Sequence, residues 1–221
     1  MFLLSRILFI CLCTVTFQAM TAESAIRYVA LGDSYTIGTG AEPQESWPSL
    51  VTERLQKKGM AIELVSNLGE NGFTTQDLIS DELPELKTLQ PDFVTLLIGV
   101  NDWVQGVSAQ TFRKHFAFIL SDLLRILPDT KNILIITIPD FSVTPAGREF
   151  ANGRDIAQGI AEFNKIIQEE AEAHRINVVD LYPLSQTIGA SYVAADGLHP
   201  SAEGHVRWAQ LIEPAFPKRL P

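Results

Sequence analysis

The chain has 221 residues, of which 46% are hydrophobic and 19% are charged, and its formal net charge at neutral pH is −9. This length and apolar fraction fit one globular domain with a sizeable core and exclude a disordered polymer. The acidic balance repels nucleic acid phosphates and anionic lipid surfaces, which argues against a nucleic acid partner. Because no repeat and no Ser, Gly or Pro tract divides the sequence, we expect no second domain.

Residues 1–22 have the layout of a signal peptide. Arg6 precedes an apolar run over 7–15, after which the sequence turns polar. The run is shorter than the roughly 20 residues that a membrane-spanning helix needs. We therefore expect a secreted or periplasmic protein whose mature part is residues 23–221, with an uncleaved membrane anchor as the alternative.

Both cysteines, Cys11 and Cys13, lie inside this segment. A lipid anchor at Cys11 is a second alternative, although the residue before it is bulky where a lipoprotein processing site has a small one. Removal of residues 1–22 would leave a chain without disulfides or a thiol nucleophile. It would also remove Arg6 and no acid, so we expect no stable membrane association after cleavage.

Five short apolar runs rich in branched residues predict buried strands. They are 26–31, 62–66, 93–98, 133–138 and 176–181. The long intervals between them carry helical periodicity, with further helices expected at 47–57, at 75–89 with Pro84 breaking or restarting it, and after Ser201. This alternation predicts a three-layer α/β/α fold with a five-stranded parallel sheet.

Polar groups follow the predicted strands at the points where catalytic residues of such sheets gather. They are 32–34, 67–72, 99–102 and Asp140, and a further group, 196–200, lies in the last loop before the final helix. We therefore expect these segments to meet at one edge of the sheet.

Ser34 is the candidate nucleophile, because Gly32 permits a sharp turn that exposes its hydroxyl directly after the first strand. A serine needs a base to take its proton and a group to orient that base. His199 can accept the proton, and Asp196, three residues earlier, can reach its other ring nitrogen. The N–H of Ser34, the amide of Asn101 and the N–H of Gly72 would form an oxyanion hole.

The segments Gly32-Asp33-Ser34, Gly99-Val100-Asn101-Asp102 and Asp196-Gly197-Leu198-His199-Pro200, in this order and spacing, resemble the blocks of the GDSL, or SGNH, hydrolase family. The resemblance covers essentially the mature chain, 23–221, and is closest in style to bacterial lysophospholipase and thioesterase I-like esterases. Any one block is weak evidence by itself, whereas all of them in order are specific.

The resemblance implies a flavodoxin-like sheet and an esterase or lipase that acts on a small-molecule acyl ester without a metal or organic cofactor. It implies Ser34 as nucleophile, His199 as base and Asp196 as orienter, with Ser34, Gly72 and Asn101 as oxyanion donors. Tyr35 stands where the family name has leucine. Gly69 is an alternative to Gly72, which is preferred because Asn67 precedes it by five residues.

Other polar residues have structural interpretations. We expect Asp33 and Asp102 to hold their loops through backbone N–H groups, and the histidines at 115, 174 and 205 to be structural. Trp103 and the segment 141–145 are candidates for the acyl pocket or for apolar packing.

The sequence leaves the substrate open among a lysophospholipid, a short-chain ester, a thioester and an O-acetylated sugar, and it does not predict an oligomeric state. A second function from another class is a flavodoxin-like module in which the loop 34–40 cradles phosphate or flavin. That loop lacks the lysine of a P-loop and the spacing of a dinucleotide fingerprint. No Gly-x-Ser-x-Gly elbow of an α/β-hydrolase occurs.

Overall fold

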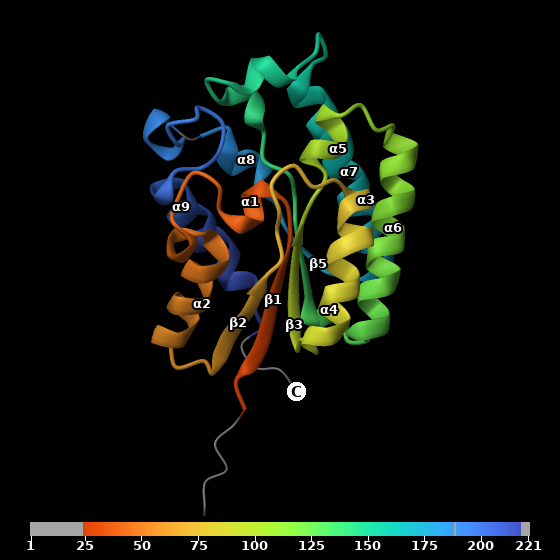
Figure 1. Ribbon diagram of the computed structural model, residues 1–221, viewed down its shortest axis with the longest axis vertical. Helices are drawn as coiled ribbons and strands as arrows, with labels where there is room; N and C mark the ends of the chain where they lie inside the picture. The colour runs from red at the N-terminus through yellow and green to blue at the C-terminus, as the bar shows by residue number, and fades with distance from the viewer. Residues whose placement is uncertain (1–23, 188, 218–221) are drawn as a thin grey trace, which may run out of the picture.

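The computed structural model describes residues 24–187 and 189–217. Five parallel strands form one sheet in the order β2-β1-β3-β4-β5 (Figure 1). The strands are β1 (Ile26–Gly32), β2 (Ile62–Asn67), β3 (Phe93–Leu97), β4 (Ile133–Ile136) and β5 (Asn177–Val179). The predicted five-stranded parallel sheet is confirmed.

Helices cover both faces of the sheet (Figure 1). On one face lie α2 (Trp47–Lys57) and α9 (Ala202–Ile212), which pack against each other. On the other lie α3 (Thr75–Asp77), the π-helical turn η2 (Leu78–Glu82), α4 (Leu83–Leu89), α6 (Ala109–Ile126) and α7 (Ile156–His174). Three short helices, α1 (Ser34–Ile37), α5 (Val100–Val104) and α8 (Tyr182–Ser185), follow the carboxyl ends of β1, β3 and β5. The three-layer α/β/α architecture is therefore as predicted.

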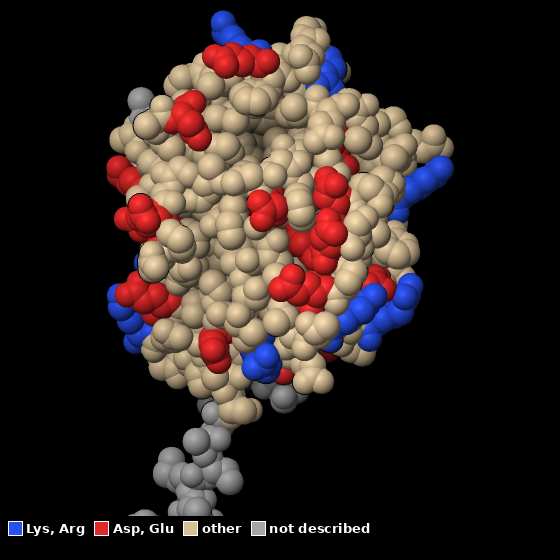
Figure 2. Space-filling view, in the orientation of Figure 1, with Lys and Arg blue, Asp and Glu red and all other residues tan. Residues whose placement is uncertain are grey.

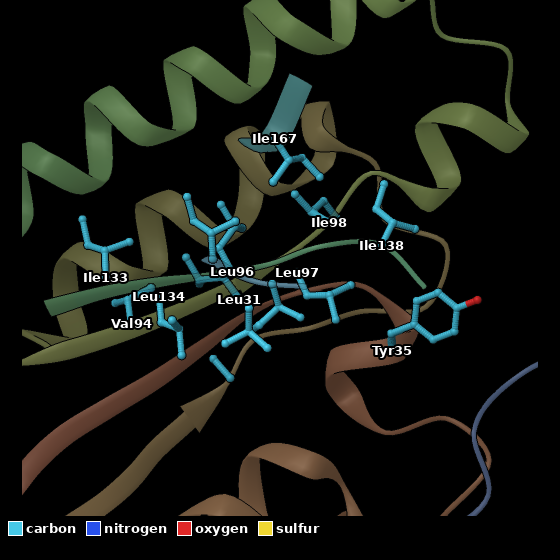
Figure 3. Packing of buried hydrophobic residues seen from close by; sticks show 14 of the residues in the cluster. Leu31, Tyr35, Val94, Leu96, Leu97, Ile98, Ile133, Leu134, Ile138 and Ile167 are labelled. Carbon is cyan, nitrogen blue, oxygen red and sulfur yellow. The ribbon is translucent and has the colours of Figure 1, made fainter. Parts of the chain in front are cut away.

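The core lies on both sides of the central strands. Every residue of β3 and β4 is buried, which explains why these strands are almost continuously apolar. Figure 3 shows their side chains, among them Leu96, Leu97 and Ile133, packed together with Leu31 of β1. Such two-sided burial fixes the strand ends firmly, and it is these ends that carry the polar groups.

Strands β4 and β5 end earlier than the apolar runs suggested. Beyond Ile136 the N–H of Ile138 donates to the side-chain oxygen of Asn164 on α7 at 2.8 Å. The N–H of Leu181 donates to the hydroxyl of Thr137 at 2.9 Å. At these positions side-chain oxygens accept the backbone N–H groups in place of a neighbouring strand. The sequence therefore stays apolar for a few residues beyond the end of regular strand pairing.

The predicted helical region 75–89 is interrupted before Pro84, and a new helix begins around this residue, which is the restarting alternative of the prediction. The chain widens into the π-helical turn η2, and Pro84 then lies in the first turn of α4, where a missing N–H has no cost. A π-turn inside helical structure commonly marks a position where a side chain is directed to a functional region. Here it carries Glu82 into the interior.

The predicted signal peptide, residues 1–22, and both cysteines lie outside the described residues. Within residues 24–187 and 189–217, no helix has the length and hydropathy to cross a bilayer.

Candidate active site

Ser34 lies at the first position of α1, where β1 leaves the sheet. Gly32 has φ +152°, and a Cβ there would meet the carbonyl oxygen of Leu97 at 2.1 Å and the hydroxyl of Thr36 at 2.3 Å. Only glycine fits this exit. Asp33 then caps α1, its Oδ1 accepting the N–H of Tyr35 at 3.0 Å. These constraints place the Ser34 hydroxyl at the carboxyl edge of the sheet.

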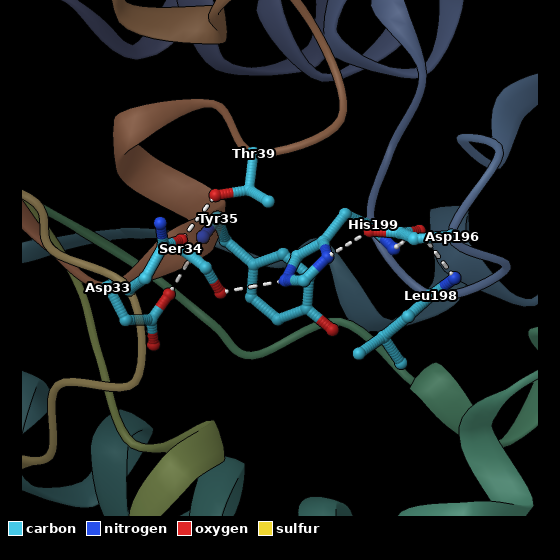
Figure 4. A network of polar contacts seen from close by, with 8 residues as sticks. Asp33, Ser34, Tyr35, Thr39, Asp196, Leu198 and His199 are labelled. Atoms are coloured by element: carbon cyan, nitrogen blue, oxygen red, sulfur yellow. Dashed lines mark hydrogen bonds and ion pairs between the residues drawn. The ribbon is translucent and has the colours of Figure 1, made fainter.

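His199 lies between Ser34 and Asp196 (Figure 4). Its Nε2 is 3.0 Å from the Ser34 Oγ, and its Nδ1 is 2.6 Å from the Asp196 Oδ2. The other Asp196 oxygen accepts the N–H groups of Leu198 at 2.8 Å and of His199 at 3.0 Å. The carboxylate therefore holds both the backbone of its loop and the imidazole, and the three predicted side chains form a continuous hydrogen-bonded series.

The surroundings of the series favour an ionised Asp196 and a fixed imidazole. Partial burial opposes the charge of Asp196, but the N–H of Leu198 and the contacts with His199 outweigh it and lower the pKa of Asp196. The ring of Tyr35 meets the His199 ring edge-on, with centroids 5.8 Å apart, and also packs against the ring of Trp208, with centroids 5.5 Å apart. The imidazole is thus oriented by packing as well as by the carboxylate.

Asn101 on α5 faces the same edge. Its Nδ2 donates to the carbonyl of Phe73 at 2.9 Å, which leaves the second amide hydrogen for another acceptor. The neighbouring Asp102 is fully buried, and it accepts the N–H of Thr75 at 2.8 Å as well as the Thr75 hydroxyl. The predicted loop-holding roles of Asp33 and Asp102 are confirmed by these bonds.

The two glycines of the 67–72 segment differ in their surroundings. The N–H of Gly69 donates to the Asn67 side chain at 3.3 Å, and a Cβ on Gly69 would lie 2.8 Å from the Ile37 nitrogen. Gly69 therefore serves close packing against α1. Gly72 has φ +82°, precedes the Phe73 whose carbonyl holds Asn101, and its N–H donates to no acceptor among the described residues. Of the two glycines, Gly72 is therefore the one whose N–H is available to a ligand.

A small cavity, about 70 Å³ in volume, opens beside the Ser34 hydroxyl. The polar residues Ser34, Asn101 and His199 lie on its wall, and the rest of the wall is formed by Tyr35, Val100, Val104, Phe141, Phe150 and Leu198. None of these side chains carries a fixed charge. The cavity can therefore take a neutral, largely apolar group and present it to the serine.

Comparison with protein families gives the same assignment as the geometry. Residues 30–207 match the model of the GDSL-like lipase/acylhydrolase family. The chain belongs to this family. As a member of the GDSL-like family, it is a carboxylic ester hydrolase.

Individual relatives and structures agree. The chain is 23% identical to an arylesterase of Vibrio mimicus over 99% of this chain and 98% of that protein. It is 29% identical to thioesterase 1/protease 1/lysophospholipase L1 of Escherichia coli (strain K12) over 52% of each chain. The crystal structure of a lipase/acylhydrolase from Enterococcus faecalis superimposes with a TM-score of 0.70 and 26% identity, covering 89% of this chain and all of that one.

Two further residues of this GDSL-like hydrolase support the site without having been predicted. The guanidinium of Arg154 lies 4.0 Å from the centroid of the Trp103 ring and donates to the carbonyls of Trp103 at 2.6 Å and Val104 at 2.9 Å. These bonds cap the carboxyl end of α5 and fix the segment that carries Phe150.

The buried carboxyl of Glu82 accepts the N–H of Gly32 at 2.9 Å. Neither Arg154 nor Glu82 belongs to a recognisable motif, so no sequence signal indicated them.

The remaining histidines lie away from the cavity. His205 on α9 is fully buried, and burial lowers its pKa to about 4, so its ring is neutral at physiological pH. His115 on α6 contacts the Thr75 hydroxyl, which in turn bonds Asp102. Among residues 24–187 and 189–217, no group of three or more His, Cys, Asp or Glu side chains converges as a set of metal ligands.

Proposed function

We propose that this hydrolase is a secreted or periplasmic serine esterase that forms an acyl-enzyme on Ser34. The observation that carries the proposal is the series from the Ser34 Oγ through His199 to Asp196, with separations of 3.0 Å and 2.6 Å, at the wall of an apolar cavity. Hydrolysis of p-nitrophenyl esters by the purified mature chain tests it. Turnover no greater than that of a Ser34→Ala sample would overturn it.

In the first half of the reaction, the Ser34 oxygen attacks the ester carbonyl carbon while its proton passes to the Nε2 of His199. Asp196 accepts the Nδ1 proton in a hydrogen bond and stabilises the resulting imidazolium. The tetrahedral intermediate then collapses, the ester C–O bond breaks, and the leaving alcohol takes the proton from Nε2. The acyl group remains on Ser34.

In the second half, a water molecule attacks the acyl carbon and gives its proton to His199. Collapse of this intermediate breaks the bond to Ser34, whose oxygen recovers the proton from Nε2. The carboxylic acid leaves, and the enzyme returns to its starting protonation state. No metal or organic cofactor enters this sequence of steps.

The negative charge that forms on the carbonyl oxygen requires donors held in place before the reaction. We assign this role to the N–H of Ser34, the N–H of Gly72 and the free amide hydrogen of Asn101. The Asn101 side chain is fixed by its bond to Phe73, so it would not reorganise during the reaction.

Replacement of Asn101 by alanine is expected to lower kcat by roughly 100- to 1,000-fold with a small change in KM, because the lost bond is strongest in the transition state. The Asn177→Ala variant, changed at an exposed position at the start of β5, is the control and is expected to keep wild-type kcat. Steady-state kinetics with p-nitrophenyl acetate measures both. A loss of about tenfold or less in Asn101→Ala would contradict the assignment.

We further propose that the acyl group of the substrate is neutral and apolar and occupies the cavity beside Ser34. Val100 and Val104 of α5 form one part of its wall, and Phe141 and Phe150 form another. A relative is named acetylxylan esterase and another arylesterase. Of these names, acetylxylan esterase supports esters of a small acyl group. The cavity wall favours carbon chains over charged acids.

Phe150 is expected to limit the length of the acyl chain. Its truncation in Phe150→Ala should raise the ratio of kcat/KM for p-nitrophenyl octanoate to that for the acetate by about tenfold or more, since even one methylene in an apolar pocket has an effect of at least about this size. Val143→Ala, on the same segment but 48% exposed, is the matched control. An unchanged ratio in Phe150→Ala would place the acyl chain elsewhere.

The alternative of a phosphate- or flavin-binding loop receives less support. The N–H groups of Thr36 and Ile37 donate to the Asp33 carbonyl, and those of Gly38 and Thr39 donate to the Ser34 carbonyl. A loop that cradles phosphate needs free N–H groups pointing outward. In residues 34–40, most N–H groups instead donate to carbonyls of the same turn.

A further inference from the structure

Two buried carboxyl groups hold the turn that carries Ser34, and the ester hydrolysis proposed above uses neither of them directly. Asp33 accepts the N–H of Tyr35 on one side of Ser34, and Glu82 accepts the N–H of Gly32 on the other. Both bonds lie between 2.9 and 3.0 Å. The backbone on either side of the nucleophile is thus fixed by a carboxyl oxygen.

Each of these carboxyls has a second oxygen that is buried and has no hydrogen-bond partner among the described residues. They are the Oδ2 of Asp33 and the Oε1 of Glu82. Asp33 is fully buried and Glu82 is 2% exposed. Two buried carboxylates with unpaired oxygens in one region would be strongly destabilising, because neither charge is solvated or paired.

The groups that face this pair are acidic. Asp102 of α5 adds its negative charge to the environment of Asp33. Glu70, in the loop after β2, and Asp81, on η2, act on Glu82 in the same way. His115 of α6 approaches Asp102 but is separated from it by the Thr75 hydroxyl. Figure 2 shows Asp and Glu side chains gathered on the face where α3 and α4 lie, with Lys and Arg mainly towards its margins.

A single proton bound by Asp33 and Glu82 would remove most of this electrostatic repulsion. Burial raises the pKa of Asp33 to about 8, and burial together with the charge of Asp33 raises the pKa of Glu82 to about 9. Because the two groups interact, these values describe the pair rather than separate sites. At neutral pH a protonated Glu82 can accept the Gly32 N–H with one oxygen and donate from the other towards Asp33.

We propose that Asp33 and Glu82 share a single proton, directly or through one water, and that neutral Glu82 is a positioning residue for the nucleophile turn. The proton lies on the Oε1 of Glu82 and is directed to the Oδ2 of Asp33, which stays ionised and keeps its bond to Tyr35. The proposal rests on Ser34 being the nucleophile. It adds that activity depends on a proton held behind the turn, separate from the one that His199 transfers.

Loss of this proton at alkaline pH has two consequences. It places a second negative charge next to the turn where the oxyanion forms, which opposes the transition state. It also completes a loss of folding stability: a carboxyl whose folded pKa is raised contributes stability that is fully present below its unfolded pKa, and this contribution falls as the pH rises from there to the folded value, here about 9.

The Glu82→Gln variant tests the proposal, because a glutamine amide imitates the protonated acid. Its oxygen can accept the Gly32 N–H and its nitrogen can donate to Asp33. For wild type we expect kcat/KM for p-nitrophenyl acetate to fall tenfold or more between about pH 8 and about pH 10. For Glu82→Gln we expect neutral-pH activity within about threefold of wild type and no such fall.

Glu85→Gln is the matched control, since it removes an exposed carboxylate from the neighbouring helix α4 and should retain the wild-type alkaline fall. Thermal unfolding provides a readout independent of activity: the wild-type Tm should decrease from about pH 5 to about pH 9 and level off above, and that of Glu82→Gln should decrease less. An alkaline fall in activity and a Tm profile that are the same in both proteins would overturn the proposal. Absence of esterase activity in wild type would instead overturn the proposed function. The Tm comparison of wild type and Glu82→Gln would still test whether Asp33 and Glu82 share a proton.

Discussion

Replacement of Ser34 by alanine is expected to reduce kcat for p-nitrophenyl esters by roughly 10⁴-fold or more. The Ser34 hydroxyl is the only group that the His199 Nε2 contacts in the described hydrogen-bond network, at 3.0 Å. Without it no acyl-enzyme can form, and the remaining oxyanion donors would act only on attack by water. The measurement is steady-state hydrolysis by purified wild type and variant.

Ser34→Ala should leave the fold intact, because Asp33 and Glu82 hold the turn through backbone N–H groups rather than through the serine side chain. An unchanged Tm checks this. Ser121→Ala, at an exposed position of α6, is the control and should keep full activity. A fluorophosphonate probe should label wild type and Ser121→Ala but not Ser34→Ala; labelling of Ser34→Ala would assign the nucleophile to another residue.

Replacement of Asp196 by asparagine is expected to lower kcat by roughly 10³- to 10⁴-fold. An asparagine oxygen can still accept the N–H groups of Leu198 and His199, so the loop should keep its shape. Its amide hydrogens, however, would face the His199 Nδ1 and force the ring proton onto Nε2. That proton would point at the Ser34 hydroxyl, which could no longer transfer its own.

The effect of Asp196→Asn is separable from a general loss of negative charge. Glu203→Gln removes an exposed carboxylate from the start of α9 and should change kcat by less than about twofold. Because the pKa of Asp196 is lowered, its charge is present throughout the neutral range and the difference should persist there. A kcat for Asp196→Asn within about tenfold of wild type would show that His199 does not need the carboxylate.

Much of the fold followed from local patterns. The apolar runs and helical periodicity predicted five strands, and the segment 47–57 matches α2 at both ends. Local patterns failed where side chains took over backbone pairing. Asn164 and Thr137 end β4 and β5 early. Those outcomes depend on partners distant in sequence, which periodicity does not record.

The residues of the candidate site were predictable to different degrees for a physical reason. Two short segments of the sequence indicate a catalytic role by their residue types and spacing alone. They contain Gly32 and Ser34 in the first and Asp196 and His199 in the second. Glu82 has no such neighbourhood, since its carboxyl meets Gly32, 50 positions away, only when η2 packs against the end of β1.

By itself the sequence determined the class of this protein: a parallel α/β domain with a serine, a histidine and an aspartate at the ends of its elements, in the order of the GDSL-like hydrolases. The tertiary structure decided what surrounds those residues. It placed apolar side chains beside Ser34, directed Arg154 onto the end of α5, and buried two carboxyls behind the nucleophile turn. Burial and desolvation are properties of the packed chain, and no local pattern specifies them.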